Sequence, residues 1–351
     1  MAQRIVSSIR DLGVHARFMH VCGTHQDTIV KHGLDAMLRD CGVDITQGPG
    51  CPVCVTTPLE IEEAIQLARG GKIITSFGDM IRVPGLQCCL QDMNAQGCDV
   101  RTVYSIEDAV GISRSNKDRE VVFVAVGFET TAPTTASVLL SDPPSNFSVL
   151  CCHRLIPPAL KAILDMGEIR IDGFIEPGHV STVIGSKPYE CITERYRIPQ
   201  VIAGFEPLDV LMGVYMLAKM FKDGEARVVN EYKRAVRSEG NVKAQRVVDM
   251  VFSRCGVKWR GFPVIDDSGL ALRRGFSRYD ARLLFEDELE EVYSRDYGEP
   301  PGCRCGEVLR GLCSSRDCSL FGVDCTPDHP VGPCMVSVEG SCHIEYRYSS
   351  V

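Results

Sequence analysis

The stretch Val121-Val122-Phe123-Val124-Ala125-Val126, followed at once by Gly127-Phe128-Glu129-Thr130-Thr131, decides the fold of this chain. A continuous apolar run rich in valine is typical of a strand that is buried on both faces, as in a parallel sheet. A glycine and polar residues follow where such a strand ends and a helix begins. Because ligands of open α/β sheets bind at the carboxyl ends of the strands, this motif is a candidate binding site.

Similar apolar runs alternate with helix-like segments over residues 18–220, which is the pattern of repeated β-α-β units. Besides 121–126, the expected strands are 18–21, 43–46, 72–75, 100–104, 148–150, 173–175 and 200–203. The polar stretch 111–120 lacks an apolar period, so we place a domain boundary there. We therefore expect two small Rossmann-like α/β domains, at 1–114 and 115–224, each with about four strands, and a cleft between them.

Beyond residue 225 the character of the sequence changes. A charged, helix-like stretch from 225 to about 252 leads into a segment rich in glycine, proline and cysteine. Because proline interrupts helices, we expect no long helix near the C-terminus. The sequence thus predicts a third, mixed and loop-rich domain at 225–351, in which a metal centre supplies the cohesion that a small core lacks.

The chain has 351 residues and 18 cysteines, seven of which lie between positions 303 and 342. The N-terminus does not resemble a secretory signal, so we expect a cytoplasmic protein with reduced thiols. In that compartment a cysteine cluster indicates metal binding or redox chemistry. A net charge of −8 without a basic run argues against a nucleic-acid partner, and no apolar run is long enough to span a membrane. Phosphate-binding motifs for ATP or NAD are absent from the sequence.

Thiols and imidazoles follow the first two expected strands. Cys22 and His25 belong to Cys-Gly-Thr-His, and Cys51 and Cys54 form Cys-Pro-Val-Cys. The latter spacing is typical of thiol redox proteins, and the helix start at 57–60 would favour a thiolate nearby. The alternatives are half of a zinc site for the pair and an inert buried thiol for Cys22.

Two motifs in the second half of the α/β region carry further candidates. Glu129 opens a helix after the strand at 121–126, and His179 lies in Pro-Gly-His-Val-Ser, where Gly178 permits close backbone approach. We expect both side chains to face the cleft. Helix capping is the alternative role for the residues around Glu129, and His153 either faces the ligand or caps a helix.

The C-terminal cysteines follow the pattern Cys303-x-Cys305-x12-Cys318-x6-Cys325-x8-Cys334-x7-Cys342, with Cys313 inside the first long gap. These six thiols exceed what one zinc ion or one cubane cluster uses. An economical interpretation is a [4Fe–4S] cluster with four ligands plus one redox-active pair. A zinc site is the alternative, and the spacing does not choose the four ligands. The other cysteines are expected to be core or loop residues: Cys41, Cys88, Cys89, Cys98, Cys151, Cys152, Cys191 and Cys255.

Taken together, these motifs resemble the HypD family of [NiFe]-hydrogenase maturation proteins over almost the whole chain. The segments that carry the resemblance are Cys-Gly-Thr-His at 22–25, Gly-Pro-Gly-Cys-Pro-Val-Cys at 48–54, Gly-Asp-Met-Ile-Arg-Val-Pro at 78–84, Gly-Phe-Glu-Thr-Thr-Ala-Pro at 127–133, Pro-Gly-His-Val-Ser at 177–181, Gly-Phe-Glu-Pro at 204–207 and Gly-Pro-Cys-Met-Val-Ser at 332–337. Departures from the family pattern are Gln26-Asp27 after His25, Cys152 before His153, and Cys313.

The resemblance implies a scaffold that works with the small protein HypC to assemble the Fe(CN)2CO group of the hydrogenase. Cyanide would arrive as a thiocyanate from HypE, a transient partner that acts alone or with HypF. By the same resemblance, Cys22 holds the iron and Cys51 with Cys54 forms the second essential thiol pair. The implied cluster ligands are Cys303, Cys318, Cys325 and Cys342, with Cys305 and Cys334 as a redox pair similar to that of ferredoxin:thioredoxin reductase.

Our hypothesis from the sequence is an electron relay from the cluster through Cys305–Cys334 and Cys51–Cys54 to iron at Cys22. The protein would be an assembly scaffold with redox activity rather than a classical metabolic enzyme. One alternative is a stand-alone iron-sulfur reductase of protein disulfides. The other is a zinc-stabilised α/β binding protein.

Overall fold

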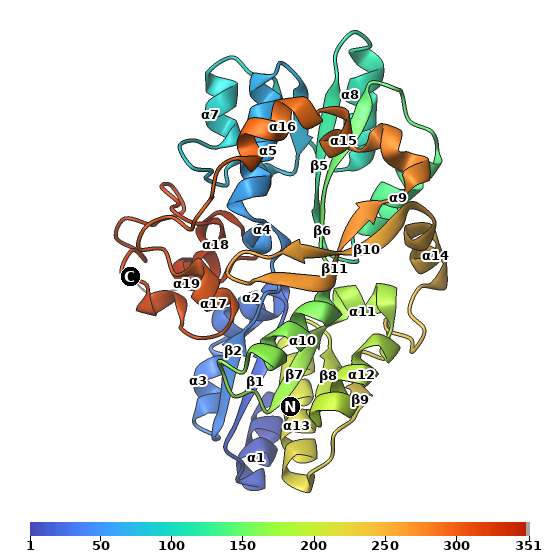
Figure 1. The fold of residues 1–351 in the computed structure, drawn as a ribbon. Coiled ribbons are helices and arrows are strands. Elements are labelled where there is room, and N and C mark those ends of the chain that lie inside the picture. Colours follow the sequence, from blue (N-terminus) through green and yellow to red (C-terminus); the bar gives the residue numbers. More distant parts are fainter. Residues whose placement is uncertain (349–351) are drawn as a thin grey trace.

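The computed structural model describes residues 1–348, whose strands form two parallel sheets and one antiparallel hairpin. Sheet A has the order β2-β1-β7-β8-β9, sheet B has the order β4-β3-β5-β6, and β10 pairs with β11. The strands are β1 (Ala16–His20), β2 (Val43–Gln47), β3 (Ile73–Ser76), β4 (Val100–Thr102), β5 (Val121–Gly127), β6 (Phe147–His153), β7 (Gly173–Pro177), β8 (Gln200–Ala203), β9 (Val228–Asn230), β10 (Phe252–Lys258) and β11 (Val264–Leu272). In Figure 1, sheet A lies below, sheet B lies above, and the hairpin crosses between them. The eight strands expected from the sequence are all confirmed, with small differences at their ends.

Helices connect and cover the sheets. Those up to the end of sheet B are α1 (Ala2–Leu12), α2 (Gly23–Lys31), α3 (Leu34–Arg39), α4 (Pro52–Val55), α5 (Pro58–Arg69), α6 (Gly78–Ile81), α7 (Leu90–Ala95), α8 (Ile106–Ser115) and α9 (Ala132–Leu140). The later ones are α10 (Ile156–Met166), α11 (Gly178–Ile184), α12 (Lys187–Tyr196), α13 (Pro207–Asp223), α14 (Val242–Val251), η1 (Arg274–Tyr279), α15 (Ala281–Leu284), α16 (Glu286–Tyr293), α17 (Cys305–Leu309), η2 (Ser315–Asp317), α18 (Pro333–Val336) and α19 (Ser341–Tyr348). Among residues 1–348, no helix is long and apolar enough to cross a bilayer.

The expected grouping of consecutive strands into two domains is wrong. β1 pairs with β2 and β7, whereas β3 pairs with β4 and β5. The chain crosses from sheet A to sheet B through α4 and α5 and returns through α10 (Figure 1). A strand buried on both faces has the same apolar pattern in either sheet, so the pattern locates strands without assigning them to sheets. The boundaries at 1–114 and 115–224 therefore do not coincide with the sheets.

Sheet B shows why its central strand is a continuous apolar run. Val121, Phe123 and Ala125 belong to the core shared with α8 and α9, while Val122 and Val124 belong to the core shared with α5. Successive side chains of a strand point to opposite faces, so a strand covered by helices on both faces is apolar at every position. Sheet A is covered in the same way, by α1 and α13 on one face and α10 and α12 on the other.

The region beyond residue 225 differs from the expectation. The predicted helix from 225 to 252 is wrong over its first half, because Val228–Asn230 form β9 at the edge of sheet A and the helix begins only at Val242. The β10–β11 hairpin was not anticipated. Between residues 294 and 348 the longest helix, Ser341–Tyr348, has eight residues, which confirms the expected absence of long helices in this described segment.

Candidate functional site

Cys22 lies just after β1, directly before α2, and is 7% exposed. Burial raises the pKa of its thiol to about 11, although the backbone N–H of His25 opposes that rise. Gly50 lies against this residue, since a Cβ at Gly50 would come within 2.1 Å of the Cys22 nitrogen. The N–H of Gly23 also donates to the carbonyl oxygen of Gly50, at 3.3 Å. The loop after β2 therefore holds the Cys-Pro-Val-Cys element beside Cys22, as the strand-end argument predicts.

The two candidate histidines share one aromatic neighbour. The ring centroid of Phe205 lies 3.9 Å from that of His179 and 5.0 Å from that of His25. The Nε2 atom of His25 is 2.9 Å from the carbonyl oxygen of Gly204, and burial lowers the pKa of His25 to about 4. His25 is therefore neutral at physiological pH, and it ties the Cys-Gly-Thr-His motif to the end of β8. His179 is exposed on the outer side of this stack.

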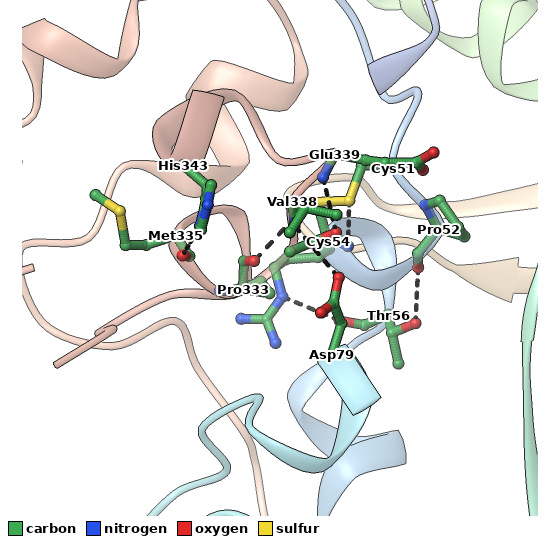
Figure 2. The surroundings of a disulfide bond; sticks show 12 residues. Cys51, Pro52, Cys54, Thr56, Asp79, Pro333, Met335, Val338, Glu339 and His343 are labelled. Carbon is green, nitrogen blue, oxygen red and sulfur yellow. Dashed lines mark hydrogen bonds between the residues drawn. A yellow bond between two sulfur atoms is a disulfide. The ribbon is translucent and has the colours of Figure 1, made fainter. Parts of the chain in front are cut away.

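Cys51 and Cys54 form a disulfide at the start of α4, and both are fully buried (Figure 2). Cys51 is the N-cap of this short helix, and its Sγ accepts a hydrogen bond from the Cys54 N–H at 3.1 Å. The capping box predicted for the next helix is present, because Thr57 and Glu60 exchange hydrogen bonds between side chain and backbone. The cysteine pair thus lies close to helix starts, which is the environment that the redox interpretation requires. In this bonded form the two sulfurs are not free thiolate ligands.

The C-terminal region covers this disulfide. The Sγ of Cys54 lies 3.9 Å from the carbonyl oxygen of Pro333, the residue before Cys334 (Figure 2). Two polar contacts from α6 and its end support the cover: the Val338 N–H donates to Asp79 at 3.2 Å, and Arg82 donates to the Val336 carbonyl oxygen at 3.2 Å. The motif at 78–84 therefore positions the C-terminal segment over the Cys-Pro-Val-Cys element.

The C-terminal cysteines converge on one cavity in the part of the molecule drawn at the left of Figure 1. Its walls combine thiols with the apolar side chains of Leu320, Phe321 and Met335. The cysteines that line it are Cys303, Cys305, Cys318, Cys325 and Cys342. Gly332 completes the enclosure, because a Cβ there would meet both the Cys303 and the Cys305 sulfur at 2.7 Å. All four cysteines that the resemblance implies as cluster ligands are thus brought together.

Cys334 lies beside this cavity rather than in its lining. Its thiol interacts with those of Cys305 and Cys342, and these interactions together with burial raise the pKa of Cys334 well above its usual value. Hydrogen bonds with the thiols of Cys305 and Cys334 lower the pKa of Cys342. Cys305 and Cys334, the suggested redox pair, are therefore neighbours. Cys313 instead lines a separate polar cavity of about 480 Å³ together with Gln47.

The donor set fits an iron-sulfur cluster better than a single ion. Cysteine thiolates are the usual ligands of such clusters, and apolar walls limit access of water. A tetrahedral zinc site needs four donors that converge on one point. Within the described part of the chain, no three histidine, cysteine, aspartate or glutamate side chains are grouped closely enough to hold one metal ion. Cys22, Cys51 and Cys54, the expected iron ligands, likewise do not form such a group in the described part of the chain.

Glu129, which we expected to face the cleft, is buried two residues after the end of β5. Its Oε1 accepts a hydrogen bond from the Ile156 N–H at 2.9 Å, and burial raises its pKa to about 7. Glu129 also lines a cavity of about 820 Å³ that α10, α12, α14 and the hairpin enclose. Cys22 does not belong to the lining of this cavity. The cavity lined by Glu129 and the site around the buried Cys22 thiol are therefore separate.

Two buried polar residues near this centre were not predicted as site residues from the sequence. Glu176 is the second-last residue of β7 and is fully buried, and burial raises its pKa well above the usual value, with a smaller contribution from Glu129. Tyr189 of α12 is also fully buried, and both glutamates and Cys22 contribute to the rise in its pKa. A carboxyl inside the apolar strand Gly-Phe-Ile-Glu-Pro was the available signal for Glu176. Tyr189 carried no distinguishing signal.

A parallel α/β fold that places a buried cysteine pair between a strand-end thiol and a cysteine-lined cavity is typical of proteins that act through their thiols. The comparison with known proteins specifies the family. A model of the HypD family, described as the hydrogenase formation hypA family, matches residues 1–349. The chain belongs to this family, and its role is hydrogenase maturation.

Individual relatives agree with this assignment. The hydrogenase maturation factor HypD of Cupriavidus necator is 42% identical over 99% of this chain and 94% of its own length. HypD of Escherichia coli K12 is 42% identical over 95% of this chain and 89% of its own. A Methanocaldococcus jannaschii protein named for hydrogenase expression and formation is 48% identical over 95% of this chain and 92% of its own.

Proposed function

We propose that this protein is the scaffold on which, together with HypC, the Fe(CN)2CO group is assembled from cyanide that HypE delivers. The observation that carries the proposal is the position of the Cys51–Cys54 pair. The loop at Gly50 holds it against the backbone of Cys22, and Cys54 lies 3.9 Å from Pro333 beside Cys334. One exchangeable dithiol thus lies between the thiol suited to hold iron and the C-terminal cysteines.

The cysteines that would hold a [4Fe–4S] cluster are Cys303, Cys318, Cys325 and Cys342, which line one cavity. When bound, such a cluster supplies electrons one at a time. Cys305 and Cys334 are neighbours at that cavity and can store an electron pair as a dithiol. The iron itself is cargo, for which Cys22 and the reduced thiols of Cys51 and Cys54 are soft ligands.

Oxidation of the Cys51–Cys54 dithiol supplies the two electrons that cyanide release requires. A thiocyanate on a partner's cysteine, R–S–C≡N, takes two electrons: its S–C bond breaks, cyanide leaves, and the sulfur is recovered as a thiol. The two electrons come from Cys51 and Cys54 as their S–S bond forms, and two protons leave these thiols. One proton goes to the partner's sulfur and one remains. The disulfide seen here is the product state of this step.

The experiment is anaerobic co-purification of the full chain with HypC, followed by infrared spectroscopy of the CN and CO stretches. We expect the bands in the wild type and their loss in Cys22→Ala. Cys191→Ala is the matched control, because Cys191 is an exposed thiol of α12. Bands of normal intensity in Cys22→Ala would overturn the assignment of the iron thiol. Normal assembly in Cys51→Ala would overturn the role of the dithiol.

The stand-alone disulfide reductase is the weaker alternative. A reductase of protein disulfides has no use for the buried thiol of Cys22, which lies against the loop that carries Cys51. Turnover of a protein disulfide without HypC and iron would favour this alternative.

A further inference from the structure

The turn between β10 and β11, residues 259–263, contacts the short helix that carries the dithiol; we call it the hairpin turn. The backbone N–H of Arg260 donates to the carbonyl oxygen of Val55 at 2.9 Å, and its side-chain Nε donates to that of Thr56 at 3.0 Å. Val55 is the last residue of α4, and Thr56 is its C-cap. The last carbonyl groups of a helix lack partners within the helix. Arg260 therefore supplies the donors that end α4.

Further hydrogen bonds continue from this end of α4 to its beginning. The Val55 N–H donates to the carbonyl oxygen of Cys51 at 3.2 Å. The Thr56 hydroxyl donates to the carbonyl oxygen of Pro52 at 2.9 Å (Figure 2). A continuous series of hydrogen bonds therefore joins Arg260 to the residue that opens α4 and carries one of the two sulfurs.

The guanidinium group of Arg260 is buried, and its charge is matched. The side chain is 1% exposed, and its Nη1 donates to the carboxylate of Glu299 at 2.7 Å. Its Nη2 has no hydrogen-bond partner among residues 1–348. A buried cation with an unsatisfied donor is a costly way to end a helix, for which a glycine is usual. Because Glu299 offsets the positive charge, we expect Arg260 to act through the position of its donors rather than through its charge.

The hairpin turn is itself held on two sides. The ring of Trp259 is fully buried and stacks on that of Phe128, with 5.8 Å between the ring centroids. Gly261 has a φ of 79°, and a Cβ there would lie 2.4 Å from the Cα of Gly306 in α17, the helix that begins with a cysteine of the suggested redox pair. Arg260 therefore projects from backbone that cannot move freely.

The S–S bond and Arg260 restrain the same helix. In the disulfide form the crosslink itself holds Cys51 and Cys54 together. In the dithiol form that crosslink is gone, and the hydrogen bonds from Arg260 keep the two ends of α4 in place. Thiols that are held close together form a disulfide more readily, because their effective concentration is high. Such a pair is the stronger reductant.

We propose that Arg260 is a positioning residue that holds the reduced thiols of Cys51 and Cys54 close together and so makes the pair a stronger reductant. The proposal rests on the proposed function for its use, in which the pair gives two electrons and its two protons leave as the S–S bond forms. The positioning itself requires neither cyanide nor a partner protein. It can therefore be measured in the isolated chain.

The test is the midpoint potential of the Cys51–Cys54 couple in the full-length, anaerobically purified protein. The protein is equilibrated with mixtures of reduced and oxidised dithiothreitol. Two electrons and two protons pass from dithiothreitol, which closes to its cyclic disulfide, to the S–S bond, which opens to two thiols. Acid quenching, alkylation and mass measurement of the peptide give the dithiol fraction. We expect Arg260→Gln to weaken the disulfide about tenfold, which makes the potential about 30 mV less negative.

Arg260→Lys separates position from charge. Lysine keeps a positive charge for Glu299, but it lacks the fork that bonds to Glu299 and Thr56 together. Positioning therefore predicts a less negative potential in both variants. A charge effect predicts no change in Arg260→Lys and a more negative potential in Arg260→Gln, because thiolates would lose a nearby cation. Arg254→Gln, at an exposed arginine of the same hairpin, is the matched control and should leave the potential unchanged.

Trp259, the only tryptophan of the chain, reports whether the hairpin turn stays packed. Its fluorescence emission should be the same in the wild type and in the variants that are compared. If Arg260→Gln shifts the emission to the red, Arg260→Lys decides, because its buried charge keeps a partner. A wild-type potential in Arg260→Lys, or a more negative potential in Arg260→Gln, would overturn the proposal.

The potential is measured without HypC, HypE or cyanide, so the two proposals fail separately. If the wild type transfers no cyanide, the proposed function fails and the potential alone judges Arg260. If cyanide is transferred, we expect its rate to fall about tenfold in Arg260→Gln, in step with the weaker disulfide. A wild-type rate with a shifted potential would overturn the role of the dithiol in the proposed function and leave the positioning by Arg260 supported.

Discussion

Gly50 shows how one missing side chain sets the position of the dithiol. A Cβ at this residue would lie 2.1 Å from the nitrogen of Cys22 and 2.2 Å from the carbonyl carbon of Val21. These are backbone atoms of a buried strand end and cannot move aside as a flexible side chain would. In Gly50→Ala the loop must therefore retreat and carry Cys51 away from Cys22. We expect the free energy of unfolding to fall by about 1–3 kcal/mol, as for other overpacked interiors.

Gly111 is the matched control for this substitution. It lies inside α8, where a Cβ would meet nothing within 4 Å. Alanine is favoured over glycine in a helix interior by about 1 kcal/mol, so Gly111→Ala should raise the unfolding free energy. Chemical unfolding of both variants measures the difference. Equal midpoints for the two would contradict the close approach of Gly50 to Cys22.

At the scale of elements, Glu60 joins the start of α5 to sheet B and to the C-terminal half of the chain. Its carboxylate accepts from the Thr57 N–H and from the buried Arg154 at 2.6 Å, and Arg282 lies 3.7 Å away. Burial alone would raise the pKa of Glu60, but the two arginines lower it below its usual value. Glu60→Gln leaves Arg154 buried without its charge partner, and we expect it to cost about 3–5 kcal/mol.

The lowered pKa of Glu60 also makes the free energy of unfolding depend on pH. Because the folded-state pKa lies below the unfolded value, the stabilisation is fully present above the ordinary glutamate pKa and is lost as the pH falls through the lower folded value. Glu60→Gln should lack this contribution to acid unfolding. Asp165→Asn, which removes an exposed partner of Arg195, is the control and should cost less than about 1 kcal/mol. Equal losses of unfolding free energy in the two variants would show that the buried Glu60–Arg154 pair stabilises the fold no more than an exposed ion pair does.

The elements also show what the sequence reveals and what it does not. Local chemistry was predictable: the strand ends at Cys22 and Glu129 and the capping box at Thr57 depend on neighbouring residues alone. The assignment of strands to sheets depends on crossovers that leave no local signal. The hairpin was missed because its burial depends on packing against distant parts of the chain, and Glu176 was missed because its burial depends on tertiary packing in the same way.

At the scale of the whole molecule, the C-terminal region acts as a cover over the Cys51–Cys54 disulfide, and its attachment to α6 controls access. Asp79 accepts from the Val338 N–H at 3.2 Å, which ties the segment after α18 to sheet B (Figure 2). Loss of one such hydrogen bond costs about 1 kcal/mol, or about fivefold in the equilibrium between closed and locally opened forms. Asp79→Ala should therefore speed reduction of this disulfide by a small phosphine about fivefold, followed as the thiols that appear over time.

The comparison variant is Asp165→Ala, which removes an exposed carboxylate that interacts with α12 and not with the cover. It should leave the reduction rate unchanged. Global unfolding is excluded as the cause if the unfolding midpoint of Asp79→Ala stays close to that of the wild type while its disulfide reacts faster. If both variants react at the wild-type rate, local opening of the cover does not limit access to the dithiol, and the electron pair must then enter through a route that leaves the Pro333 contact in place.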